Sequence, residues 1–167
     1  MALKKTSGEI QISFRVDETA ANTFTQDEIS LPLDPLNNEV FVVTSALLDL
    51  QPPDAQAATN TAVNGALTTT SQTVVVGLNS SQCIVAAETG IRAAGFVDAG
   101  VLYSDMAPDG PQAGMDTIAI IATDNFFVSV VGTANVGAKS LNGRMYGYRA
   151  KADAATYAAL VQSELLS

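Results

Sequence analysis

Apolar and polar residues alternate along much of this chain, and a period of two is the signature of a half-buried β-strand. The clearest case is Glu9–Val16, where isoleucine, phenylalanine and valine occupy every second position and polar residues lie between them. Further strands are predicted at Glu28–Leu33, Glu39–Leu50, Thr73–Leu78, Gln82–Ala87, Ala99–Tyr103, Thr117–Thr123, Phe126–Val131 and Arg144–Ala150. Short strands separated by turn residues are typical of an antiparallel β-sandwich or barrel, so one all-β domain over residues 1–167 is predicted.

Two Asn-Gly dipeptides, Asn64-Gly65 and Asn142-Gly143, predict β-hairpins. A type I′ turn needs a positive φ at both central residues, and Asn-Gly tolerates that conformation best. The second hairpin would bring five side chains of its two strands to one face: Lys139, Leu141, Arg144, Tyr146 and Tyr148.

The last segment changes period and predicts a helix over 151–166. Its residues are good helix formers, and an apolar stripe runs along one face: Tyr157, Leu160, Val161 and Leu165. The stripe is narrow, so we expect the helix to lie on a sheet or on a neighbouring subunit. A second, weaker helix is predicted over Ala86–Ala94, although Gly90 argues against it.

The composition excludes several classes of enzyme and metal site. The chain is 47% hydrophobic and 15% charged, which excludes intrinsic disorder, and it contains no histidine and no tryptophan. Without histidine there is no Ser-His-Asp or Cys-His couple and no histidine-based zinc site. Cys83 lies in an apolar stretch with no base beside it, which favours a small core residue over a nucleophile. We therefore expect no enzyme activity, no cofactor and no metal.

Two segments are predicted to be loops. Gln51–Thr61, rich in alanine, proline, asparagine and threonine, is expected to be long and mobile. Ser104–Asp116 carries Asp105, Asp109 and Asp116, and carboxylates on a flexible loop are ligands that calcium prefers, but their spacing does not fit an EF-hand. A turn-rich loop is the favoured interpretation. The calcium interpretation belongs to an alternative function, a lectin-like or carbohydrate-binding β-sandwich module.

Charge is distributed unevenly. Eight Lys and Arg oppose 17 Asp and Glu, giving a net charge of -9, so strong binding to nucleic acid is not expected. Most of the cations lie near the two ends of the chain, whereas the middle is acidic. We predict a subunit interface formed by Lys139, Arg144, Tyr146, Tyr148, Arg149 and Lys151. The alternatives for this set are a solvated edge strand or, with cations beside aromatic rings, a nucleic-acid contact.

No stretch of about 18 successive apolar residues is present, so no membrane span is expected. The start, MALKKTSGEIQISF, has lysines but no apolar core typical of a secretory signal, which predicts residence in the cytosol.

The string DNFFVSVVGTANVGAKSLNGRMYGYRAKAD and the tail YAALVQSELL resemble the small single-β-barrel coat proteins of icosahedral viruses. The resemblance implies a jelly roll of about eight strands, a coat-forming function without catalysis, and self-association as trimers, pentamers or hexamers. It also implies a place in the virion, assembled in the host cytoplasm, with copies of itself and any other coat protein as partners. The chain departs from many such proteins in lacking a long basic N-terminal arm, because only Lys4 and Lys5 precede the first strand. Packaging of a genome by charge neutralisation is therefore not expected.

Overall fold

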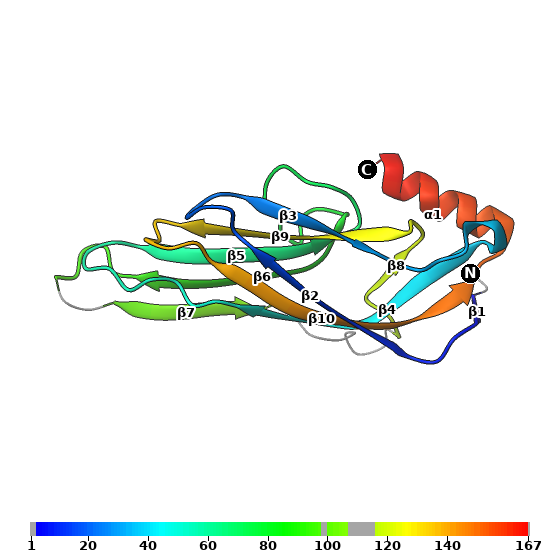
Figure 1. Ribbon diagram of the computed structural model, residues 1–167, viewed down its shortest axis with the longest axis horizontal. Helices are drawn as coiled ribbons and strands as arrows, with labels where there is room; N and C mark the ends of the chain where they lie inside the picture. The colour runs from blue at the N-terminus through cyan, green and yellow to red at the C-terminus, as the bar shows by residue number, and fades with distance from the viewer. Residues whose placement is uncertain (1–2, 98–99, 107–115, 167) are drawn as a thin grey trace.

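The computed structural model describes residues 3–97, 100–106 and 116–166. Within these residues the chain forms two antiparallel sheets, packed face to face, and one α-helix at one end of the molecule (Figure 1). Sheet A contains β1 (Lys4–Lys5), β2 (Ile10–Asp17), β10 (Ser140–Lys151), β4 (Glu39–Leu50) and β8 (Ala119–Ile121). Sheet B contains β3 (Thr25–Ser30), β9 (Asn125–Thr133), β5 (Thr61–Thr68), β6 (Cys83–Arg92) and β7 (Val101–Met106). The helices are the 3₁₀ turn η1 (Pro35–Asn37) and α1 (Ala154–Leu166).

The strand order is that of a jelly roll. Four antiparallel pairs are nested along the chain, namely β2 with β10, β3 with β9, β4 with β8, and β5 with β6. The pairs alternate between the two sheets, as they do when one long hairpin is rolled up, and β10 with β4 and β9 with β5 complete the sheets. Strands β1 and β7 extend this eight-stranded arrangement. The prediction of an antiparallel β-sandwich with a C-terminal helix is confirmed.

The predicted strands occur with one exception. Glu39–Leu50 has its predicted bounds, Thr117–Thr123 is shortened to Ala119–Ile121, and the others are shifted or extended by a few residues. Thr73–Leu78 is not a strand but part of the β5–β6 connection, which is fastened to β3 because Gln72 N donates to Gln26 Oε1 at 2.8 Å.

The helix predicted over Ala86–Ala94 is wrong, because this segment lies mostly in β6. In β6 it pairs with β5 on one side and β7 on the other, and Val85 and Ala87 alternate into the core. Neighbouring strands satisfy its backbone hydrogen bonds, so the spacing of Glu88 and Arg92 does not specify a helix.

Both predicted Asn-Gly hairpins are wrong. Asn64-Gly65 lies in the middle of β5 and Asn142-Gly143 lies within β10, and neither glycine has a positive φ. Both glycines instead provide space where side chains cross the interior: a β-carbon on Gly65 would lie 2.9 Å from Leu50 Cδ2. A β-carbon on Gly143 would lie 2.4 Å from Phe14 Cε2. Close packing therefore explains these glycines.

The main core lies between the sheets and is formed by alternate residues of both. Its largest fully buried side chains include Phe41, Phe126, Leu67, Ile121, Leu141 and Met145. The rings of Phe14 and Phe126 meet edge to face across the two sheets, with centroids 5.8 Å apart and planes at 75°. This is a favourable geometry for an aromatic pair.

A second apolar cluster fixes α1 on the outer face of sheet A. Tyr157, Leu160 and Val161 pack on Val40 and Val42 of β4. The helix therefore lies on a sheet, as predicted, but two details differ. It begins after Asp153, whose carboxylate accepts a hydrogen bond from Thr156 N at 2.8 Å, so Lys151 belongs to β10. Leu165 is exposed, and Glu164 is the buried residue of this last turn.

Candidate functional site

The predicted interface residues do not share one face. Arg144, Tyr146 and Tyr148 occupy alternate positions of β10 and lie on the outer face of sheet A, where Tyr148 contacts the cluster beneath α1. Arg149 and Lys151 lie on the opposite side of the strand. Lys151 is exposed to solvent, because it lies beyond the end of the core. The structure thus separates a set that the sequence placed together.

Leu141 and Lys139 differ most from the expected hairpin face. Leu141 points into the core and is fully buried, because β10 is continuous through residues 142 and 143. Lys139 precedes β10 and its side chain is only 4% exposed. Its ammonium donates to Asp54 Oδ1 at 2.6 Å, so its charge is used within the chain.

Asp54 fastens the predicted mobile loop to the rest of the molecule. Its second carboxylate oxygen accepts the backbone N–H groups of Val136 and Gly137 at 2.9 and 3.1 Å. The hydrogen bond from Lys139 and then that from Gly137 lower the pKa of Asp54 below its ordinary value. The loop between β4 and β5 is therefore held to the loop between β9 and β10.

Glu18 joins a third loop to the same end. It is 5% exposed, and its carboxylate accepts the N–H groups of Thr23, Gly132 and Lys139 at 3.0, 2.7 and 2.8 Å. Asn135 adds a further link, since its Oδ1 accepts from Asp54 N at 2.9 Å. These buried groups are satisfied by backbone partners, which gives them a structural role in holding three loops together.

An apolar surface lies beside this loop end. Phe96, Val97, Val101 and Leu102 are 50%, 80%, 60% and 65% exposed, and they flank the turn between β6 and β7. Strand β7 is an edge of sheet B, and it begins at the end of the molecule farthest from α1 (Figure 1). We refer to these four residues and the free edge of β7 as the apolar edge.

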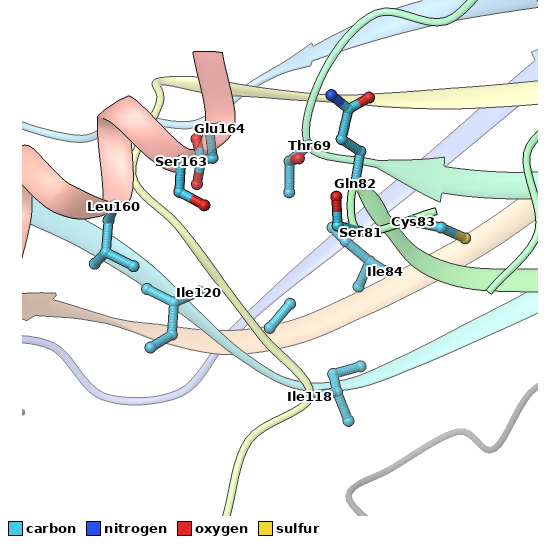
Figure 2. A pocket seen from close by; sticks show the side chains of 11 residues that line it. Thr69, Ser81, Gln82, Cys83, Ile84, Ile118, Ile120, Leu160, Ser163 and Glu164 are labelled. Carbon is cyan, nitrogen blue, oxygen red and sulfur yellow. The ribbon is translucent and has the colours of Figure 1, made fainter. Parts of the chain in front are cut away.

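A pocket of about 220 Å³ lies between α1 and the sandwich (Figure 2). Figure 2 shows Leu160, Ser163 and Glu164 on the side of α1 and residues of β6, β8 and the β5–β6 connection on the other side. Both oxygens of Glu164 already accept hydrogen bonds, from Ala122 N at 2.7 Å and from Thr123 N at 3.1 Å. The one carboxylate of the pocket thus serves to dock the helix.

No helix among the described residues is both long and apolar enough to cross a membrane. The same part of the chain contains no group of three or more Cys, Asp or Glu side chains placed to hold a metal ion. The calcium hypothesis also involves Asp105 and Asp109, whose side chains lie outside the described ones, while Asp116 is exposed. Cys83 is a half-buried free thiol, and burial raises its pKa to about 11.

Comparison with solved structures finds 21 similar chains, including the following two. One is the Merkel cell polyomavirus VP1 unassembled pentamer, with a TM-score of 0.40 and 7% identity, covering 90% of this chain and 98% of that chain. The other is from Desmodium yellow mottle tymovirus, with a TM-score of 0.29 and 10% identity, covering 88% of this chain and 90% of that chain. No family model and no curated protein matches the sequence. The fold assignment rests on the strand order of the two sheets.

Proposed function

We propose that this chain is a structural protein that self-assembles into a virion coat or a similar shell, and the apolar edge is the observation that carries the proposal. Proteins usually protect an edge strand with charged residues, with proline or by making it short. The opposite edge of sheet B follows this rule, because β3 carries Asp27 and Glu28. The first three residues of β7, Val101, Leu102 and Tyr103, carry no charge, and the one charged residue of this strand, Asp105, comes near its other end.

Burial of the apolar edge would supply part of the free energy of association. Covering a valine, leucine or phenylalanine side chain contributes roughly 1.5–3 kcal/mol, less whatever part is already buried. Association itself costs an estimated 4–15 kcal/mol, so the apolar edge has to belong to a larger contact, and stable interfaces bury about 1,200–2,000 Å². In the proposal the β10 residues Arg144, Tyr146, Tyr148, Arg149 and Lys151 contribute further contact area.

The fold is compatible with this role, since jelly rolls occur in viral capsids as well as in lectin domains. That is an analogy at the level of the fold, and the choice between the two functions rests on the apolar edge. The proposal gives the chain a place in the virion after assembly in the host cytoplasm, copies of itself as partners, and no catalytic role.

Light scattering and negative-stain microscopy of the purified chain test the proposal. We expect large closed particles from the wild type, and smaller species from L102K, which places a charge on the apolar edge. L165K is the matched control, because Leu165 is 68% exposed, close to the 65% of Leu102, but lies on α1. A monomer at every concentration would overturn the proposal, and a melting temperature raised by calcium would then favour the binding module.

A further inference from the structure

Lys4 and Lys151 lie directly opposite each other on β1 and β10. Both side chains are exposed, and neither forms a hydrogen bond or an ion pair with the part of the chain that the structure describes. Like charges at opposed positions of neighbouring strands destabilise a sheet. Lys5, the next residue of β1, points to the other face of the sheet, where its Nζ lies 4.3 Å from the centre of the Tyr148 ring. We refer to Lys4, Lys5 and Lys151 as the cationic end.

The carboxylate paired in register with Lys151 forms no ion pair with Lys4 or Lys151. Glu39 is the partner of Lys151 on β4, but its Oε1 accepts from Thr6 Oγ1 at 3.1 Å and its Oε2 accepts from Asp34 N at 3.0 Å. Its one cationic neighbour within 4.0 Å among the described residues is Arg149. The cationic end therefore keeps its charge open to an anionic partner.

An acidic counterpart lies on the edge of sheet B. Asp27 and Glu28 are exposed on β3, and Asp124 is exposed beside the end of that strand, where its carbonyl accepts from Leu31 N at 2.7 Å. Glu28 accepts one hydrogen bond, from Asn125 Nδ2 at 2.7 Å, and no ion pair involves these three acids within the described residues. We refer to Asp27, Glu28 and Asp124 as the acidic edge.

We propose that the acidic edge of one copy docks on the cationic end of the next copy. This inference rests on the proposed function and specifies how the subunits meet. A second copy is the occupant because it carries the complementary charge, and a chain of net charge -9 offers its few clustered cations to its own carboxylates.

The two patches also bear on the symmetry of the contact. Figure 1 shows β1 at the end of the molecule that carries α1, while β3 runs along the length of the sandwich. A contact made once between two different patches is heterologous, so each added copy leaves one patch of each kind free and the assembly closes into a ring or continues to grow. Two copies that exchange both contacts about a twofold axis would instead form a closed, isologous dimer.

Charge reversal tests this pairing in the full chain. We expect K4E/K151E and D27K/E28K each to raise the concentration for half-assembly at least about tenfold. Thermal melting of each variant is measured alongside, because K151E places a carboxylate opposite Glu39 and E28K removes the hydrogen bond from Asn125. The quadruple variant K4E/K151E/D27K/E28K restores both attraction and the wild-type net charge, so it should assemble as the wild type does. D116K, which reverses an exposed acid outside the acidic edge, is the control and should assemble normally.

The outcomes separate this inference from the proposed function. A wild type that never assembles contradicts the proposed function. A wild type that assembles, together with double variants that assemble equally well or a quadruple variant that stays defective, contradicts the pairing alone. Should a reversal impair folding, the neutral pair K4Q/K151Q provides the same comparison without introducing new carboxylates.

Discussion

The Phe14 ring on β2 occupies the space beside Gly143, its register partner on β10, so closely that a β-carbon on Gly143 would lie 2.4 Å from Phe14 Cε2. Sheet B repeats the arrangement, since a β-carbon on Gly90 would lie 2.4 Å from Cζ of its register partner Tyr103. In both pairs the missing side chain of glycine lets an aromatic ring of the neighbouring strand lie over the backbone. The Gly143 pair also positions the ring of Phe14 against Phe126 in the other sheet.

We expect Gly143→Ala to destabilise the fold by about 2 kcal/mol or more, because the new methyl group would overlap the Phe14 ring and the carbonyl oxygen of Leu47 at 2.8 Å. Urea unfolding followed by circular dichroism measures the change. Gly8→Ala is the control, since nothing lies within 4 Å of a β-carbon at that position. Equal losses in both variants would show that the close approach to Phe14 is unimportant.

These glycines explain why the strands were predictable and the hairpins were not. Alternation and an apolar run ended by prolines are local signals, so β2 could be recognised by the first and β4 by the second. Asn142-Gly143 has the same letters whether glycine adopts a turn or makes room for a ring. Its meaning depends on Phe14, which lies far away in the sequence.

In the last helix, too, local features could be predicted from the sequence and a long-range contact could not. Asp153 and Thr156 form a local cap that the sequence contains, and the stripe of Tyr157, Leu160 and Val161 identified the buried face. The docking role of Glu164 could not be predicted from the helix alone. Its carboxylate accepts the backbone N–H groups of Ala122 and Thr123, which lie far from it in the sequence.

Glu164→Ala should therefore destabilise the protein by about 2 kcal/mol, since it leaves the N–H groups of Ala122 and Thr123 without their acceptor. The free energy of unfolding from urea titration is the measurement. Gln162→Ala, on the exposed side of the same helix, should change it by less than about 0.5 kcal/mol. A loss of the same size in both variants would contradict the docking role of Glu164, because alanine has the highest helix propensity and the substitutions themselves do not weaken the helix.

The candidate site was predictable only in part. The cluster of cations near the C-terminus is visible in the sequence, but Lys139 could not be assigned to Asp54 without the tertiary structure, which brings two loops together. The apolar edge was missed because Val101 and Leu102 resemble core residues, and only the sheet order shows that β7 has no neighbouring strand on one side among the described residues.

The Asp54 and Lys139 pair predicts a specific acid sensitivity. The folded state lowers the pKa of Asp54, so this group stabilises the fold above its unfolded pKa, near about 3.9, and loses the contribution as the pH falls through the lower folded value. Asp54→Asn removes the effect. We expect the difference in melting temperature between wild type and variant to be constant above about pH 5 and to shrink below about pH 4. A difference that does not change between pH 7 and pH 3 would contradict the assignment.

Cys83 should react slowly in the folded protein. Burial raises its pKa from 9.0 to about 11, so at pH 8 the thiolate fraction is about one hundredfold lower than in the unfolded chain. The rates of alkylation by iodoacetamide with and without about 8 M urea, followed by mass spectrometry, measure this ratio. Similar rates in both conditions would show that the thiol is not protected by burial.

Strand β10 carries two arginines whose charges we expect to contribute to assembly. Arg144 is exposed on the outer face of sheet A, and Arg149 donates to Pro32 O at 3.4 Å and lies 4.0 Å from Glu39. We expect R144E/R149E to weaken assembly without unfolding the monomer, because interfacial charges fix the docking of subunits more than they stabilise each fold. Sizing chromatography and thermal melting are the two measurements, and R144E alone tests the fully exposed position. T19E/Q162E adds two carboxylates at exposed positions elsewhere and should leave particle size unchanged.

Since the guanidinium groups act through charge, wild-type assembly should also weaken as added salt shortens the Debye length from about 8 Å at 0.15 M to about 3 Å at 1 M. An R144E/R149E variant whose particle size and salt response equal those of the wild type would remove β10 from the interface and leave the apolar edge as the contact to pursue.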